Sequence, residues 1–196
     1  MSRAQTMKTV KIDDLIQGLK SISDDEFTCD NVYTFLGDHP VEVNSITRYF
    51  YWSPDFYTRN LIYRDDRFEM LAICWEAGQQ STVHNHAEQK CWMTVPVGRL
   101  KGQNFDVVEI DESKSYCKLV ETDSFELADC LSAKVELEKP IHQILNLSDY
   151  GQRAVSIHIY SKPFNRCLSY CRDTDTFKQV ELCYTTIGGK LVSQAA

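Results

Sequence analysis

The first fifty residues show the hydrophobic spacing of helices. Apolar residues recur with a helical period, so that four of them share one face: Ile12, Leu15, Ile16 and Leu19. A second helix is expected from about Asp24 to Phe35, ending near Gly37, and a third, shorter one over Val41 to Tyr51. The segment of about residues 9–50 is therefore predicted to be helical.

From about residue 56 the pattern changes to short runs rich in β-branched and aromatic residues, separated by Gly, Asp, Asn and Ser. Strands are predicted over residues 57–63, 69–75, 81–86, 90–97, 100–110, 116–122, 124–127, 142–147, 154–161 and 179–185. Asp65-Asp66 and Gly98-Arg99 favour hairpin turns. We therefore expect a mainly β fold, an antiparallel barrel or sandwich over about 56–188, within one domain spanning residues 1–196.

One predicted strand alternates cleanly between apolar and polar side chains. Its apolar face carries Val155, Ile157 and Ile159. Its polar face carries Ser156, His158 and Tyr160. A serine, a histidine and a tyrosine in one row can form a hydrogen-bond relay in which His158 holds the tyrosine hydroxyl. The solvent-facing side of an edge strand would show the same pattern, so the alternation alone leaves both interpretations open.

Composition and charge argue against nucleic-acid and membrane partners. The chain has 196 residues and a formal net charge of −7, and no basic stripe appears, which argues against a nucleic-acid partner. Its eight cysteines follow no secretory signal, so they are expected to be thiols in the cytoplasm. No apolar run is long enough to span a bilayer, and we expect no membrane partner. The chain is predicted to be a monomer.

Two of the five histidines, His84 and His86, are separated by one residue at the end of a predicted strand. Residues two apart on a strand point to the same face, roughly 7 Å apart, so two such imidazoles can bind one metal ion. His142 and His158 lie in later predicted strands. The pair therefore predicts a metal site, for which His142 and His158 are the remaining candidate histidine ligands in predicted strands.

The spacing around this histidine pair resembles the first motif of the cupins, in which a strand presents two histidines into a small barrel. Cys91 stands where a glutamate is usual in that motif. His142, with Asn146 four residues later, resembles the histidine and asparagine of the second cupin motif. The resemblance implies a cupin-type antiparallel β-barrel, a small jelly roll, with His84, His86 and His142 as metal ligands.

Three segments in combination resemble cysteine dioxygenase: residues 57–61, the region 84–91 and the region 156–164. This resemblance extends from about Thr9 to Gly188. It implies a mononuclear non-haem iron(II) centre held by three histidines, with O2 as co-substrate. The implied reaction is the oxidation of L-cysteine to cysteine sulfinic acid, with the substrate thiolate and amine on the iron.

The same resemblance assigns roles to further residues. Arg59 is expected to bind the substrate carboxylate, with Tyr57 on the same strand face. In the family, the tyrosine at the position of Tyr160 becomes joined to the cysteine at the position of Cys91, which implies a thioether. The tyrosine and the relay behind it are expected to act in catalysis. A surface ion pair and a packed apolar thiol are the alternative interpretations of the arginine and the cysteine.

Other functions fit part of the same pattern. If the strand continued past His86, Glu88 would share its face and complete a site suited to manganese, zinc or another iron chemistry. Asn146 is a candidate for orienting a ligand histidine, or a turn residue. Cysteamine and 3-mercaptopropionate are alternative substrates, although Arg59 together with Cys91 favours cysteine. A non-catalytic, metal-binding cupin is a further alternative.

Overall fold

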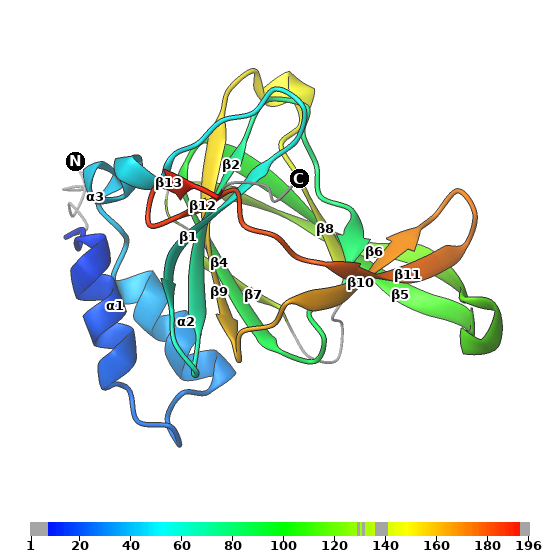
Figure 1. The fold of residues 1–196 in the computed structure, drawn as a ribbon, viewed down its shortest axis with the longest axis horizontal. Coiled ribbons are helices and arrows are strands. Elements are labelled where there is room, and N and C mark those ends of the chain that lie inside the picture. The colour runs from blue at the N-terminus through cyan, green and yellow to red at the C-terminus, as the bar shows by residue number, and fades with distance from the viewer. Residues whose placement is uncertain (1–7, 129, 131, 136–140, 193–196) are drawn as a thin grey trace, which may run out of the picture.

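The N-terminal helices cover the outer face of a β-sheet, as Figure 1 shows for the blue segments. The computed structural model describes residues 8–128, 130, 132–135 and 141–192. The helical elements are α1 (Ile12–Ser21), α2 (Cys29–Asp38), α3 (Val43–Ile46) and the 3-10 turn η1 (Thr47–Tyr49). Ile12, Leu15, Ile16 and Leu19 are all buried, which confirms the predicted face of α1. The predicted helical segment is therefore present.

The second helix begins later than predicted. The side chain of Thr28 accepts a hydrogen bond from the backbone N–H of Asn31 and caps α2, whereas residues 24–27 form turns. The acidic run around Asp24 resembles the first turn of a helix, but the helix starts at the residue whose hydroxyl can satisfy a free N–H.

Strands make up most of the remaining chain. They are β1 (Thr58–Arg64), β2 (Glu69–Trp75), β3 (Val83–His84), β4 (Lys90–Val97), β5 (Arg99–Asp111), β6 (Tyr116–Ala128), β7 (Ser132–Val135), β8 (His142–Leu145), β9 (Ala154–Ser161), β10 (Arg166–Cys171), β11 (Thr176–Glu181), β12 (Thr186–Ile187) and β13 (Lys190–Leu191). Two further 3-10 turns are η2 (Glu112–Lys114) and η3 (Ser148–Tyr150). The predicted mainly β fold is confirmed.

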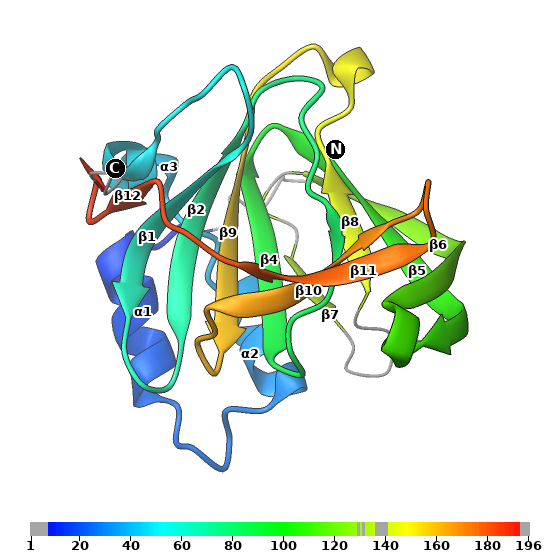
Figure 2. The same ribbon diagram turned by 45° about the vertical axis from the view of Figure 1, so that its right-hand side comes forward.

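These strands form two sheets. The first has the order β13-β12-β1-β2-β9-β4-β7, and the second is a closed ring of β10, β11, β6, β5, β8 and β3. Nearly all neighbours are antiparallel; β1 and β12 are the parallel pair among the described strands. Figure 2 shows the first sheet between the helices and the ring. The space between the two sheets is the interior of the predicted barrel.

Several predicted boundaries were wrong. The two strands expected over 116–122 and 124–127 are one long strand, β6, which pairs with β5 along most of its length. Gly98 is not a hairpin turn, because β4 pairs with β7 and β9 while β5 pairs with β6 and β8. The glycine, at φ 74°, carries the chain from one sheet to the other. The hairpin expected at Asp65-Asp66 is present between β1 and β2.

Strand β9 lies between two hydrophobic layers. Val155, Ile157 and Ile159 belong to the cluster packed against α1 and α2. On its other face, Tyr160 belongs to the cluster between the sheets, and Ser156 and His158 are buried beside it. The polar face of β9 therefore points into the interior rather than into solvent.

Candidate metal centre

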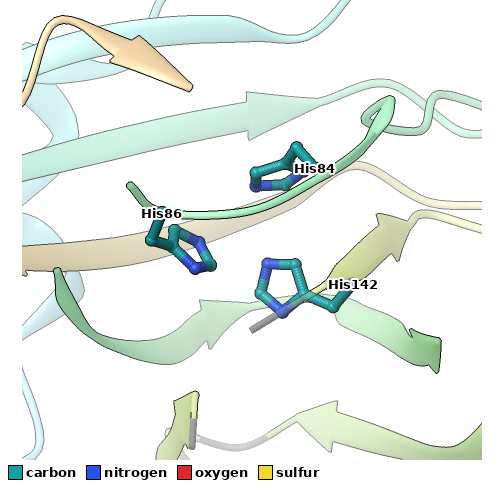
Figure 3. Close-up of side chains that lie close together, drawn as sticks. All are labelled: His84, His86 and His142. Atoms are coloured by element: carbon teal, nitrogen blue, oxygen red, sulfur yellow. The ribbon is translucent and has the colours of Figure 1, made fainter. Parts of the chain in front are cut away.

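Three histidines from two strands meet inside the barrel. His84 ends β3, His86 follows it, and His142 begins β8, where it lies directly opposite His84 in the β3–β8 pairing. One potential ligand nitrogen from each imidazole lies within 4.8 Å of the others. Figure 3 shows the three rings around a common point. The strand predicted over residues 81–86 is shorter than expected, because β3 (Val83–His84) ends at His84, and His86 reaches the common point from the segment that follows.

The nitrogen atoms of these rings are available for a metal. His84 Nδ1 lies 2.9 Å from the carbonyl oxygen of Thr82, so it donates a proton there and its Nε2 keeps the lone pair. Both ring nitrogens of His86 and Nε2 of His142 are buried without a hydrogen-bond partner in the described part of the chain. Buried polar atoms normally have partners, and a metal ion is the partner that suits three convergent nitrogens.

Burial keeps these imidazoles neutral. Desolvation lowers the pKa of His84 to about 4. It also lowers the pKa of His86 and of His142 well below the usual value, and the neighbouring histidines add to the effect. A neutral imidazole is the form that binds a metal, so the protein needs to remove few protons before an ion enters.

Two residues considered as site members lie elsewhere. Glu88 is exposed in a turn with Ala87, where both residues have positive φ. Strand β3 already ends at His84, and the Glu88 carboxylate is not among the grouped ligands. Asn146 does not orient a ligand histidine. Its side-chain N–H groups donate to the carbonyl oxygens of Trp75 and Gln152, and it therefore holds the turn before β9.

The wall opposite the histidines carries the hydrogen-bonded row of β9. Ser156 Oγ lies 2.9 Å from His158 Nε2, and His158 Nδ1 lies 3.2 Å from the hydroxyl of Tyr160. Trp75 Nε1 donates to Ser156 Oγ over 3.0 Å, which fixes the outer end of the row. Desolvation lowers the pKa of His158 to about 3, so this imidazole is neutral and has one N–H to share.

Tyr160 lies close to the histidine centre. Its ring centroid is 5.7 Å from that of His86 and 5.1 Å from that of Phe164. Cys91 on β4 is fully buried and lies directly opposite Tyr160 in the β4–β9 pairing. Directly opposite residues of antiparallel strands have Cβ atoms about 4.5–5.5 Å apart, so the thiol and the ring are neighbours.

A cavity of about 340 Å³ joins the two walls. Its lining includes Tyr57, Arg59, His84, His86, Tyr160 and Phe164. A larger groove of about 890 Å³ adjoins it and shares Thr82, Ser169 and Lys178 of the wall. The inner cavity is therefore the space in which a small molecule can meet both the histidines and the arginine.

Arg59 differs from the other arginines. Every other arginine in the described ranges forms an ion pair, whereas the buried Nε and Nη2 atoms of Arg59 have no partner there. Burial works to lower the pKa of Arg59, but Tyr160, Tyr57 and Glu69 outweigh it and raise the pKa above its usual value. A guanidinium in a cavity wall that has two buried nitrogens without partners is prepared for a carboxylate.

The structure adds residues that the sequence did not single out. Trp75 holds Ser156 and stacks on Tyr57, with ring centroids 4.5 Å apart. Phe164 packs against both His86 and Tyr160. The sequence marks Trp75 only as a large apolar residue ending a strand, a pattern that core aromatic residues share, so its N–H contact had no detectable signal.

The fold and the site together are a mainly β barrel with a buried group of three histidines that could hold a metal ion. The family model "Cysteine dioxygenase type I" matches residues 1–173. Curated relatives named cysteine dioxygenase type 1 include those of Danio rerio, 24% identical, and Rattus norvegicus, 25% identical, each over 94% of this chain and 90% of the relative. The chain belongs to the cysteine dioxygenase family, and the prediction of an enzyme of that class is confirmed.

The fold comparison gives more distant matches. A Klebsiella pneumoniae protein with a double-stranded β-helix domain matches 70% of this chain and 90% of its own, with a TM-score of 0.45 and 12% identity. Within the described residues, no helix has both the length and the apolar character that crossing a membrane requires.

Proposed function

We propose that this enzyme oxidises L-cysteine with O2 to cysteine sulfinic acid at a mononuclear iron(II) ion held by His84, His86 and His142. The observation that carries this proposal is a group of three neutral imidazoles, two of which line the cavity together with Arg59, whose guanidinium has two buried nitrogens without partners in the described chain. Membership in the family supports the same reaction.

The donor set suits a ferrous ion that binds an anionic thiol. Non-haem iron sites that use two histidines and one carboxylate leave coordination positions open, and replacing the carboxylate by a third neutral imidazole leaves more positive charge on the site. When bound, iron(II) supplies redox chemistry with O2 and lowers the pKa of a ligated thiol. His84 keeps its Nε2 directed to the ion because its Nδ1–H is held by Thr82.

Arg59 binds and orients the substrate. Its unpaired Nε and Nη2 atoms can donate two parallel hydrogen bonds to the carboxylate of an amino acid. Tyr57, stacked on Trp75, lies beside it on the cavity wall. Because the thiol and the carboxylate would be held at opposite ends of the cavity, the sulfur is placed at the histidines, and its reaction with O2 becomes effectively intramolecular.

Tyr160 holds a proton at the centre of the cavity. His158 and Ser156 fix the tyrosine hydroxyl, so that it can donate to an oxygen atom during oxidation. We also propose a thioether between Cys91 Sγ and the ring of Tyr160. That bond replaces the S–H and one ring C–H, a two-electron oxidation for which O2 is the oxidant, and it would fix the orientation of the ring.

Oxygen uptake with three thiols tests the proposal. The protein is loaded with iron(II) without oxygen, and O2 consumption is then followed with L-cysteine, cysteamine and 3-mercaptopropionate. We expect L-cysteine to be the best substrate, because cysteamine lacks the carboxylate and mercaptopropionate lacks the amine. Faster consumption with either of the other thiols would assign a different substrate, and no consumption with any of them would favour a binding protein.

A cytoplasmic location and a monomeric state stay predictions from the sequence. The thiol-rich composition favours the cytoplasmic location.

A further inference from the structure

A fully buried carboxylate lies near the cavity but has no part in the proposed reaction. Glu69, the first residue of β2, has no exposed surface. Its Oε2 accepts hydrogen bonds from Arg64 Nη1 at 2.8 Å and from the Tyr184 hydroxyl at 2.5 Å, and Arg64 also donates to that hydroxyl. Glu69 Oε1 has no partner among the described residues. We call Arg64, Glu69 and Tyr184 the trio.

The trio lies in the same row of the sheet as the tyrosine of the site. Glu69 is directly opposite Arg64 on β1 and directly opposite Tyr160 on β9. Tyr160 is in turn directly opposite Cys91 on β4. Directly opposite residues project from the same face of a sheet, so the trio continues the cavity-facing row toward β1.

Tyr184 reaches the trio from the other end of the chain. Residues 182–185, which we call the strap, connect β11 in the ring to β12 in the first sheet, and Figure 2 shows this segment crossing between the sheets. Leu182 and Cys183 of the strap line the cavity. The strap therefore forms part of the cavity wall and is attached to both sheets.

The strap is also bonded directly to the backbone of Arg59. The backbone N–H of Thr185 donates to the Arg59 carbonyl oxygen over 2.7 Å. The backbone N–H of Arg59 donates to Thr185 Oγ1 over 3.1 Å. Tyr184 is the preceding residue, so its contact with Glu69 fixes the strap next to the point where the strap meets Arg59.

The energetics of Glu69 point to a role other than stability. A buried carboxylate loses its hydration, and an ion pair with one partly exposed arginine seldom recovers the whole cost. An unpaired buried oxygen adds to that cost. Such a group is retained where it serves a specific arrangement, and the arrangement in contact with it is the strap beside Arg59.

We propose that Glu69 and Tyr184 are positioning residues, which hold the strap against β1 so that the guanidinium of Arg59 stays in place for a substrate carboxylate. This inference rests on the proposed function. It makes discrimination between thiols with and without a carboxylate depend on residues that do not touch the substrate.

The variant Tyr184→Phe tests the inference, because it removes the hydroxyl and keeps the ring. Iron(II)-loaded protein is titrated with L-cysteine under anaerobic conditions in a calorimeter. We expect the affinity for L-cysteine to fall about tenfold, the effect of losing one hydrogen bond to a charged group. We expect KM to rise similarly with little change in kcat, and the affinities for iron(II) and for cysteamine to stay unchanged.

A second cluster of the same chemistry supplies the control. The Tyr150 hydroxyl donates to Glu126 Oε1 over 2.9 Å, and Arg99 forms an ion pair with Glu126 at 3.4 Å, but this cluster is outside the cavity lining. Tyr150→Phe therefore removes a hydroxyl–carboxylate contact of the same kind at a more exposed position, and should leave the affinity for L-cysteine unchanged. Glu69→Gln, which keeps the shape but removes the charge, should shift that affinity in the same direction as Tyr184→Phe.

The outcomes separate the inference from the proposed function. An unchanged affinity for L-cysteine in both Tyr184→Phe and Glu69→Gln would overturn the inference, as would an equal loss of iron(II) or cysteamine binding, since that shows general damage. A wild-type protein that neither binds nor oxidises L-cysteine would overturn the proposed function, and the inference with it.

Discussion

The two walls of the cavity differ in whether their polar atoms have hydrogen-bond partners. The wall from β3 and β8 presents three histidines whose inward nitrogens are almost entirely without partners. The wall from β9 presents Ser156, His158 and Tyr160, which are linked in a continuous row that ends on Trp75. One wall is therefore incomplete without a ligand, and the other is satisfied by its own contacts.

This difference corresponds to two tasks, binding a ligand and orienting a side chain. Unpaired nitrogens in a buried site cost free energy in the empty protein, and that cost is recovered when a metal ion binds. A row of side chains that are hydrogen-bonded to one another costs little free energy, and it holds the hydroxyl of Tyr160 in one orientation. Arg59 belongs to the same sheet as the β9 row, but it resembles the histidines, because two of its nitrogens are buried without hydrogen-bond partners. In this cavity, the unpaired nitrogens thus lie where a ligand can bind, and the hydrogen-bonded row of β9 can orient it.

Removing a ligand from the histidine wall should have the largest effect. We expect His86→Ala to lower iron(II) affinity by more than about 100-fold, because even residues that only support a metal ligand are worth 10- to 100-fold. Activity should be lost with the metal. Metal analysis of purified protein checks the result. The control is His39→Ala, a histidine stacked on Phe35 after α2. Full iron content in His86→Ala would rule out its role as a ligand.

The second largest effect is expected from removing the guanidinium of Arg59. We expect Arg59→Met to lower kcat/KM for L-cysteine about 100-fold, because a bidentate charged contact to the carboxylate is lost. Iron(II) affinity should stay near the wild-type value, since the arginine belongs to the other sheet. Steady-state O2 uptake and metal analysis measure the two quantities. Equal losses of cysteine use and iron binding would contradict the assigned role.

The part of this arrangement that the sequence could predict is the part with strong periodic signals. Strands β2, β4 and β9 have the predicted bounds, because they are long apolar or alternating runs that the core encloses. The histidine pair was visible because its spacing is itself the geometry of a strand. His142 came from the family resemblance, since nothing local links it to a site 56 positions earlier.

Strand β10 was missed for a physical reason. Its six residues include one strong strand former, Tyr170, and no β-branched residue, and it is a strand because β11 and β3 pair with it. Glu69 was visible as a charged residue at the start of an apolar run, where strand ends are often exposed. Its burial depends on Tyr184, more than a hundred residues later, and sequence spacing contains no such information.

Acid should lower the stability of the metal-free protein, because it protonates His158 in the β9 row. Burial lowers the pKa of His158 to about 3, below the unfolded value of about 6.5. The resulting stability is fully present above pH ~6.5 and is lost as the pH falls toward 3, because the unfolded chain then binds the proton more readily. We expect a loss of roughly 3–5 kcal/mol from this group over that range. Urea unfolding of apo-protein between pH 7 and 4 measures it, with His158→Gln as the comparison. A variant with the same pH dependence as the wild type would contradict the assignment.

Removing the hydroxyl at the inner end of the row should slow turnover without disturbing the metal. We expect Tyr160→Phe to lower kcat by about 10- to 100-fold, since a positioned proton donor contributes at least that much. Iron content should be unchanged, because the hydroxyl is hydrogen-bonded to His158 and is not a proposed ligand. Stopped-flow measurement of product formation checks the rate. Unchanged kinetics would reject a role for the row in the reaction.

The smallest effect is expected from removing the proposed covalent bond between Cys91 and Tyr160. Cys91→Ser removes the proposed thioether but leaves the three histidines and the hydrogen bond to Tyr160 intact. Because His158 still holds the hydroxyl, we expect kcat to fall by about tenfold or less, with full iron content. Mass spectrometry of wild-type protein after turnover should detect the loss of two hydrogens, and the variant should show none. An iron-free Cys91→Ser protein would place the thiol on the metal instead. If the mass of the wild-type chain is unchanged after many turnovers, no thioether has formed. The hydrogen bond to His158 would then be what orients the ring of Tyr160.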